Sequence, residues 1–321
     1  MFAEKRGITS VINLVKKWIN GLKNPKKRII FLAQHGFFRN MSDEDFLKMQ
    51  FKNVFGYPLD LEHPKTFNEK LQWLKLYDRR PEYTMMVDKY KVKKYVASLI
   101  GEEHIIKTLG VWDSFDEIDF SKLPQQFVLK CTHDSGGLII CTDKSKLDLT
   151  YAKKKIMKSL ANDYYKQNRE WPYKNVKRRI IAEEYMADES GDELKDYKFF
   201  AFNGKAKAMF IASDRNNPKV ETKFDFFDME FNHLPFINGH PNATYKIVRP
   251  SSFDEMKKYA EILSEGLPEA RIDFYDINGK VYFGEITFFH WSGFEPFVPS
   301  EWDKKFGEWI TLPKKNRIIN C

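Results

Sequence analysis

Residues 271–287 read RIDFYDINGKVYFGEIT, two runs of alternating apolar and polar residues on either side of Asn278-Gly279. Asn-Gly between such runs is the strongest short signal for a β-hairpin. Each run contains an acid, Asp273 in the first and Glu285 in the second. Because strand side chains alternate between the two faces of a sheet, the geometry of the turn decides whether these carboxylates meet.

Two turn lengths are compatible with this hairpin. A two-residue turn would pair Asp273 with Gly284 and place the two carboxylates on opposite faces. A three-residue loop with Gly279 as a bulge sets Glu285 across from Arg271, with Asp273 as the diagonal neighbour on the same face. Two acids and an arginine on one face suit a Mg²⁺ ion that carries a phosphate chain. The alternative is a surface hairpin with a cross-strand ion pair.

A second segment that suits phosphate is THDSGG, residues 132–137, between two predicted strands at 126–131 and 138–141. Backbone N–H groups near glycines can close on an anion, and Lys130 at the strand end can neutralise a phosphate. Taken alone, the segment is more typical of an ordinary hairpin with a Gly-Gly turn. The P-loop and dinucleotide-binding glycine motifs are both absent from the sequence.

Further strands complete an ordered set of motifs. Residues 179–186, RIIAEEYM, read as an apolar strand running into a polar hinge, and the strand at 197–202 turns at Asn203-Gly204 into another at 206–212. The order is basic strand, glycine loop, acidic hinge, basic strand, then Arg-x-Asp-Phe and Glu-Ile-Thr. In that order the set resembles the ATP-grasp ligases, over roughly residues 60–313. The best match is the TupA-like branch, found with capsule, teichuronic acid and O-antigen polysaccharide genes and sometimes labelled glycosyltransferase.

The resemblance implies an ATP site. Lys89 and Lys130 look like the two phosphate-contacting lysines, and residues 133–137 look like the flexible lid over the β- and γ-phosphates. Backbone groups of Glu184 and Met186 would face the adenine edge, and an acid near the next strand would bind the ribose. The ATP-binding residues implied are Lys89, Lys130, His133, Asp134, Ser135, Gly136, Gly137, Glu183, Glu184, Tyr185, Met186, Asp196 and Lys198, with Glu193 as the alternative to Asp196.

The resemblance also implies the metal site and the reaction. Asp273 and Glu285 look like Mg²⁺ ligands, and Arg271 would lie beside the transferring phosphoryl group. Many members of the family have asparagine at the position of Thr287, which keeps an oxygen on the same face; a second metal would then be held partly by water. The implied activity is ATP-dependent joining of a carboxylate to an amine through an acyl phosphate. The family's genomic context suggests a uronic acid and an amino acid or amino sugar.

In the resembling family, the segment after the metal-binding Glu folds back beside the γ-phosphate, where the acceptor carboxylate must lie. Ser292 could donate to a carboxylate or phosphate, Trp291 could offer a face to a sugar ring, and His290 could help to deprotonate the incoming ammonium. A buried, satisfied histidine is the alternative for His290. The implied catalytic residues are Arg271, Lys130, Ser292 and His290. A second possible acceptor site is lined by Arg215 and the strand at 224–227.

Two other functions remain open at this point. A glycosyltransferase would hold its metal with Asp-x-Asp, and the one such triplet is Asp43-Glu44-Asp45. This triplet follows Ser42 at a predicted helix start, where acids favour the helix dipole, so a structural role is the better interpretation. The third possibility is a nucleotide-binding protein without catalysis, which the threonine at position 287 keeps open.

The formal charge of +8 is concentrated at the N-terminus. Residues 1–40 contain nine Lys and Arg against Glu4 alone, and the remaining chain has equal numbers of acids and bases. Apolar residues between Ile8 and Leu22 recur at helical spacing, which predicts a basic amphipathic helix that binds an anionic membrane surface or packs on the body. No run is long enough to span a bilayer or resembles a signal peptide. The body has no basic stripe for nucleic acid.

The chain has three cysteines, Cys131, Cys141 and Cys321, an odd number that favours reduced thiols and a cytoplasmic protein. The membrane alternative for the basic arm would make the protein peripheral on the inner face of the plasma membrane. The histidines show no zinc-type spacing. The pattern of apolar residues predicts helices at 67–77 and 253–263 and a strand at 105–109. The alternation of strands and helices predicts an α/β fold with mixed sheets and a nucleotide between two lobes. The expected division is a basic arm at 1–40, a helical region at 41–87, an ATP-grasp lid lobe at 88–186 and a C-terminal lobe with the metal site at 187–321.

Overall fold

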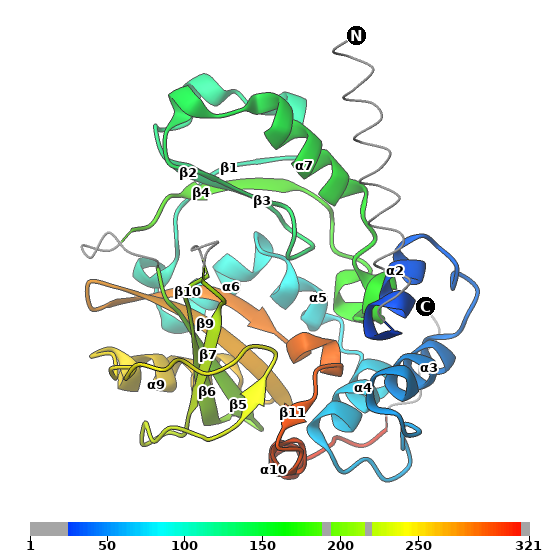
Figure 1. Ribbon diagram of the computed structural model, residues 1–321. Coiled ribbons are helices and arrows are strands. Elements are labelled where there is room, and N and C mark those ends of the chain that lie inside the picture. The colour runs from blue at the N-terminus through cyan, green and yellow to red at the C-terminus, as the bar shows by residue number, and fades with distance from the viewer. Residues whose placement is uncertain (1–24, 188–193, 216–219, 316–321) are drawn as a thin grey trace.

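The structure is a computed structural model that describes residues 25–187, 194–215 and 220–315. It has a mixed α/β fold, as predicted, in which a four-stranded sheet lies across from a five-stranded sheet (Figure 1). The helices near the N-terminus form a separate layer, and the other helices lie beside the two sheets. The described α-helices are α2 (Pro25–Gln34), α3 (Asp43–Phe55), α4 (Phe67–Tyr77), α5 (Glu82–Val87), α6 (Lys91–Ile100), α7 (Leu149–Ala161), α8 (Tyr165–Asn168), α9 (Phe253–Leu263) and α10 (Glu301–Trp309).

The four-stranded sheet and α7 form a small lobe, here called the lid lobe, built from residues 108–161 and 180–184. Its strand order is β1-β4-β2-β3, and every pairing is antiparallel. Apolar side chains on one face, such as Leu129 and Ile180, form a cluster with Ile156 of α7 that is separate from the main core. Polar side chains therefore occupy the opposite face. The strands are β1 (Thr108–Trp112), β2 (Phe127–Cys131), β3 (Leu138–Cys141) and β4 (Ile180–Glu184).

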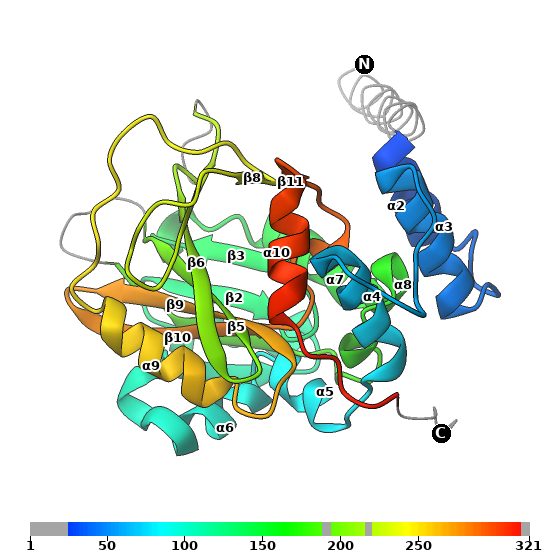
Figure 2. The ribbon, with the colours of Figure 1, turned by 90° about the horizontal axis from the view of Figure 1, so that it is seen from below.

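The five-stranded sheet carries the larger core, and its strand order is β10-β9-β5-β6-β7. Helix α9 covers one face, where Phe253 contacts Phe199 with ring centroids 5.6 Å apart (Figure 2). Side chains at the alternate strand positions point to the opposite face of the sheet, away from α9. Arg271 and Asp273 are among them. The strands are β5 (Asp196–Phe202), β6 (Lys205–Ser213), β7 (Lys223–Phe227), β9 (Glu269–Ile277) and β10 (Lys280–Thr287); β8 (Ile237–Asn238) and β11 (Phe297–Val298) form a separate pair.

The hairpin that decides the fold uses a turn and a bulge in a combination that the sequence did not predict. Of the two turn lengths considered, the structure has the two-residue Asn278-Gly279 turn, since Lys280 pairs with Ile277. A bulge at Gly284 then shifts the register by one residue and sets Glu285 directly across from Asp273. A bulge inserts one extra residue, which exchanges the faces of everything beyond it. The two carboxylates therefore share a face, as expected, by a different device.

The predicted helix starts are mostly confirmed. Ser42 caps α3 by accepting a hydrogen bond from the Asp45 backbone at 3.1 Å, and α4 and α9 have the predicted bounds. The strand expected at 105–109 instead begins at Thr108, because Ile105 forms a bridge to Phe283 of the larger sheet. Residues 105–107 thus connect the two sheets.

The predicted N-terminal arm is only partly described. The amphipathic segment between Ile8 and Leu22 lies outside the described residues. Of the rest, α2 packs on the body, with Ile29 and Ala33 buried in the main core. Within the described ranges, no helix is long and apolar enough to cross a membrane. Helix α6 also contributes its apolar side chains to the main core. The division into an arm, a helical region and two lobes remains a prediction.

Glu269 on β9 is a buried acid with an expected effect on stability. Its side chain is 2% exposed, neither oxygen has a hydrogen-bond partner among the described residues, and burial raises its pKa well above the ordinary value. The unfolded chain loses this proton at lower pH than the folded chain, so stability falls as pH rises above the unfolded pKa.

Glu269→Gln removes this proton and should therefore be more stable than the parent by a margin that widens with pH. The widening should approach about 1.4 kcal/mol per pH unit while the folded acid stays protonated. Denaturant unfolding at pH 5, 6 and 7 measures it. A margin that does not change with pH would show that Glu269 is already ionised in the folded protein.

Candidate active site

The centre of the site is a set of charged side chains on the face of the larger sheet opposite α9. Arg271 donates two hydrogen bonds to Asp273, from Nε to Oδ1 at 2.7 Å and from Nη2 to Oδ2 at 2.8 Å. The same Nη2 donates to Glu285 Oε1 at 3.3 Å and to Thr287 Oγ1 at 3.1 Å. Paired strand positions bring these four side chains together. Their arrangement follows directly from the bulge at Gly284.

The two acids differ in their surroundings. Asp273 is 1% exposed and is held by both Arg271 and Lys198. The Glu285 side chain is 37% exposed and faces the cleft. Burial alone would raise the pKa of Glu285, but Lys89, Lys198 and Arg271 outweigh it and lower the pKa to about 2. Glu285 is thus ionised and accessible at neutral pH.

This donor set fits a magnesium ion that is bound together with phosphate. Among the described residues, no group of three or more Asp, Glu, His or Cys side chains forms a closed cage for a metal. Mg²⁺ does not require one, because it is usually held by one or two carboxylates, water and substrate phosphates. Glu285, Asp273 and the Thr287 hydroxyl would supply the protein ligands. Asp273 would have to share its oxygens with Arg271 and Lys198.

Further cations surround the acid pair. Lys89 donates to the Asp134 carbonyl at 2.6 Å, and its Nζ lies 3.9 Å from Glu285 Oε2. Lys198 contacts Asp273 and lies 3.4 Å from Asp196. Both lysines are mostly buried. Positive charge at this density is suited to the oxygens of a polyphosphate.

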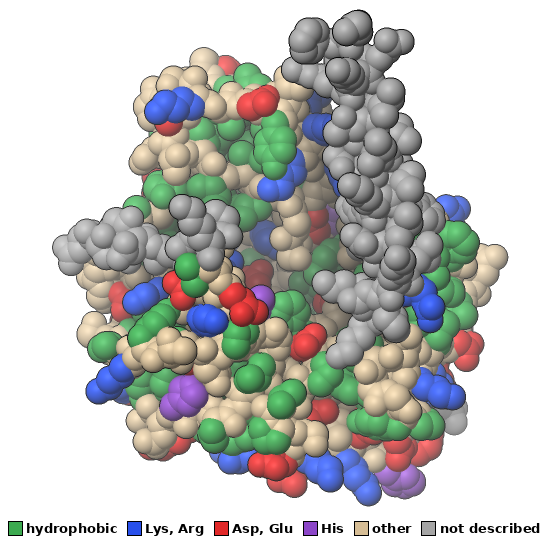
Figure 3. Space-filling view, in the orientation of Figure 1, with side chains coloured by type: hydrophobic (Ala, Val, Ile, Leu, Met, Phe, Trp, Pro, Cys, Tyr) green, Lys and Arg blue, Asp and Glu red, His purple; other side chains and the backbone are tan. Residues whose placement is uncertain are grey.

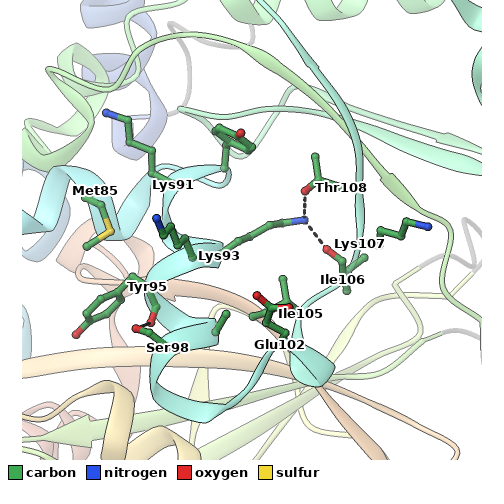
Figure 4. A pocket seen from close by; sticks show the side chains of 13 residues that line it. Met85, Lys91, Lys93, Tyr95, Ser98, Glu102, Ile105, Ile106, Lys107 and Thr108 are labelled. Carbon is green, nitrogen blue, oxygen red and sulfur yellow. Dashed lines mark hydrogen bonds between the residues drawn. The ribbon is translucent and has the colours of Figure 1, made fainter.

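A second basic cluster lies on the polar face of the lid lobe. Lys130 Nζ is 2.6 Å from Glu183 Oε2, and Lys93 of α6 contacts the other oxygen of the same carboxylate. Lys93 also donates to the Ile106 carbonyl at 2.7 Å and to Thr108 Oγ1 at 2.9 Å, beside a groove of about 1,010 Å³ (Figure 4). The two lysines lower the pKa of Glu183 against the effect of its burial.

The sequence analysis missed Lys93. Lys93 follows Lys89 by four residues, but Lys89 lies before the start of α6, so helical spacing does not link the two lysines. Lys130 is near enough to Glu285 to lower its pKa, so the lid-lobe cluster and the acid pair face each other.

The glycine loop at 132–137 is fixed at its base. Asp134 accepts from the Gly137 N–H at 3.1 Å and from the Ser159 hydroxyl, and His133 is buried with Nε2 3.2 Å from the Asn162 carbonyl. A side chain at Gly137 would lie 2.5 Å from Cys131 Sγ. Gly136 has open space beside it, and Ser135 is exposed. The backbone at 135–136 is therefore the part that faces outward.

The predicted hinge and ribose residues have mixed positions. Glu183 points to the lid-lobe lysines, whereas the Glu184 side chain turns to Lys107 at 3.6 Å. Tyr185 and Met186 are partly buried and follow β4, and neither lines the cleft described below. Asp196 is the first residue of β5 and is 3% exposed, paired with Arg215 and Lys198. Glu193 lies outside the described residues.

A cleft of about 750 Å³ is lined by eight of the predicted site residues. The space-filling view shows a hollow between the lid lobe and the larger body (Figure 3). The predicted residues that line the cleft are Lys89, Ser135, Lys198, Arg271, Glu285, Thr287, His290 and Ser292, together with Trp291 and Arg215. Asn168, Glu170, Tyr164 and Tyr173 line it as well, and the sequence analysis identified none of them.

His290 is held as a neutral ring by two hydrogen bonds. Arg271 Nη1 lies 2.8 Å from Nδ1, which must accept because the guanidinium can only donate. Nε2 therefore donates to Asn238 Oδ1 at 2.9 Å. Burial and the nearby cations lower the pKa of His290 well below its ordinary value. These contacts argue against the predicted role as a proton acceptor and indicate that His290 orients Arg271.

Comparison with known proteins identifies the family. The family model described as TupA-like ATPgrasp matches residues 69–311, about three quarters of the chain. The protein belongs to the TupA-like ATP-grasp family. Among curated proteins, no sequence matches the chain.

Several solved ATP-grasp structures are similar to the chain at low identity. D-alanine–D-alanine ligase from Bacillus anthracis complexed with ATP is 16% identical, with a TM-score of 0.39 over 63% of this chain and 55% of that one. The corresponding ligase from Helicobacter pylori is 13% identical, with a TM-score of 0.42 over 79% of this chain and 68% of that one. The ATP-grasp ligase PsnB, complexed with minimal precursor, Mg and ADP, is 10% identical, with a TM-score of 0.37 over 69% of this chain and 57% of that one. The chain spans little more than half the length of the first of these.

Proposed function

We propose that the protein is an ATP-dependent carboxylate–amine ligase that forms an amide through an acyl phosphate. The observation that carries this proposal is the Asp273–Glu285 pair with Arg271, facing Lys89 and Lys198 in one cleft of a TupA-like ATP-grasp chain. Acids that hold Mg²⁺ beside cations that contact phosphate are the parts that phosphoryl transfer requires.

MgATP would supply a phosphoryl group that turns a poor carboxylate electrophile into an acyl phosphate with phosphate as its leaving group. Arg271 and the lysines would neutralise charge on the transferring oxygens, and such preorganised charge is usually the largest contribution to catalysis. The Lys93–Glu183–Lys130 cluster would hold the phosphate chain from the lid lobe. The backbone at 135–136 would exclude water from the acyl phosphate.

The proposed acceptor is a uronic-acid carboxylate, and the proposed amine is an amino acid or amino sugar. The resemblance to a branch associated with acidic cell-surface polysaccharides supports this choice. The exposed Trp291 face at the cleft supports a sugar ring as part of the acceptor, because pyranose rings pack on aromatic faces. The membrane contact proposed for residues 1–40 would keep the cytoplasmic enzyme near lipid-linked intermediates.

Release of ADP tests the proposal directly. Purified protein with MgATP should release ADP when a uronic acid and an amine are both added, and mass spectrometry should find the amide. A glycosyltransferase would require a sugar nucleotide instead, and a protein without catalysis would bind ATP and release nothing. The Asp-x-Asp triplet gives no support to the transferase, since Asp43 is already bonded to Arg79 at 2.6 Å and to Tyr165 at 2.5 Å.

A further inference from the structure

One end of the cleft carries a negative group that the proposed ATP and metal sites do not use. Glu170 is 5% exposed and lines the cleft, and its Oε1 accepts a hydrogen bond from the Ser292 hydroxyl. Asn168 donates to the same hydroxyl at 3.0 Å. Ser292 therefore gives its proton to Glu170 rather than to a substrate carboxylate. Among the described residues, no other hydrogen bond reaches the Glu170 side chain.

The backbone around Ser292 is held in an unusual conformation. Trp291, Ser292 and Gly293 have successive φ values of 48°, 55° and 62°, in the left-handed region. A residue with a side chain pays about 1–2 kcal/mol in this region, and such strain persists only where neighbours enforce it. Here α4 enforces it, because Gln72 donates to the Gly293 carbonyl at 2.7 Å and Lys75 to the Ser292 carbonyl at 2.7 Å.

This conformation places two different groups at the cleft. Trp291 is 42% exposed, with its ring beside Phe224 and close to Gly239, where a side chain would approach within 2.7 Å. Ser292 turns the other way, onto Glu170. The strained run thus presents an aromatic face next to a buried carboxylate.

Charge within the cleft assigns the two reacting groups to different places. A substrate carboxylate and the phosphates are attracted to Arg271, Lys89 and Lys198. Glu170 repels those anions and attracts a cation. The Glu170 carboxylate also interacts electrostatically with Arg271 and Glu285, which puts it within reach of the phosphoryl site. An amine that attacks an acyl phosphate must bind close to the cations that hold the phosphoryl group, but its ammonium group needs a negatively charged side chain as its partner.

We infer that Glu170 and Ser292 form the binding site for the ammonium group of the amine substrate. This inference rests on the proposed ligase function. Glu170 takes one proton from the ammonium, and the freed nitrogen lone pair attacks the acyl carbon. The C–O bond to phosphate then breaks, phosphate leaves with the electron pair, and the second nitrogen proton goes to the phosphate. Burial raises the pKa of Glu170 despite Lys75, which makes it a better base than an exposed acid.

The test separates the two half-reactions with hydroxylamine. At high concentration hydroxylamine traps an acyl phosphate as a hydroxamate without an ammonium site, whereas an amino acid requires one. Glucuronate and galacturonate serve as carboxylates, and a panel of amino acids and glucosamine serves as amines. Glu170→Gln should form hydroxamate within about twofold of the parent rate but raise the KM for the amine about tenfold or more.

Ser292→Ala gives a second measurement, because it removes only a hydroxyl and should raise the same KM by a smaller factor. Glu269→Gln is the matched control, since it makes the same substitution at a similarly buried glutamate that does not line the cleft. Circular dichroism confirms that each variant is folded.

Each outcome has a distinct meaning. An unchanged amine KM in both cleft variants would overturn the assignment, and so would an equal loss of hydroxamate and amide formation in Glu170→Gln. A parent protein that forms no hydroxamate from either uronic acid would contradict the proposed function itself.

Discussion

Replacing Glu285 by glutamine should lower Mg²⁺-dependent turnover by about 10²- to 10³-fold, the cost of removing one preorganised group at a developing charge. The change keeps the size of the side chain and removes an anionic ligand whose pKa of about 2 guarantees its charge. Since Glu285 lies at the open side of the sheet, the fold should tolerate the loss. Initial rates of ADP release across a range of Mg²⁺ concentrations measure the effect.

Glu285→Gln is a cleaner test than Asp273→Asn. Asp273 neutralises Arg271 and Lys198 inside the protein, and removing one partner of a buried ion pair costs about 3–5 kcal/mol. Loss of activity in Asp273→Asn would therefore mix folding with metal binding. Glu261→Gln on α9, paired with Lys205 at the surface, is the control and should retain activity. Full activity in Glu285→Gln would remove Glu285 from the metal site.

Replacing Lys130 by alanine should weaken ATP binding by about 1–3 kcal/mol, which is a rise of about five- to 150-fold in Kd. Lys130 is one of two lysines on Glu183, and its loss leaves that carboxylate with Lys93 alone. The remaining pair is closer to neutral and attracts phosphate less. Calorimetric titration with an unhydrolysed ATP analogue and Mg²⁺ measures the affinity.

Lys153→Ala on α7 is the matched control, because Lys153 pairs with Asp116 at the surface of the same lobe. Its nucleotide affinity should equal that of the parent. If Lys130→Ala also binds nucleotide normally, then Lys130 is a structural partner of Glu183 and the lid-lobe cluster does not hold phosphate.

The sequence predicted the elements better than the connections between them. The hairpin at 271–287, the glycine loop and the helices α4 and α9 have local signals, such as Asn-Gly turns and helical periodicity, that act within a few residues. The bulge at Gly284 has no such signal. It depends on pairing with β9, and it decides which acids meet.

The candidate site shows the same limit. Arg271, Asp273 and Glu285 could be found because they lie close together on two adjacent strands. Glu170 lies 122 residues from Ser292 in sequence, at the N-cap of η5 (Trp171–Tyr173), and only the folded chain brings the two side chains together. His290 was predicted as a catalytic group, but its role depends on Asn238 and Arg271, which occupy both nitrogens. Such partners are invisible to spacing arguments.

Transfer of oxygen from the acceptor to phosphate tests the central claim most directly. A uronic acid labelled with ¹⁸O in its carboxylate is incubated with the protein, MgATP and the amine identified by ADP release. Breakage of the acyl phosphate C–O bond leaves one carboxylate oxygen on the released phosphate. The account predicts one ¹⁸O atom per phosphate, seen as an isotope shift in the ³¹P spectrum. Amide formed with unlabelled phosphate would contradict it.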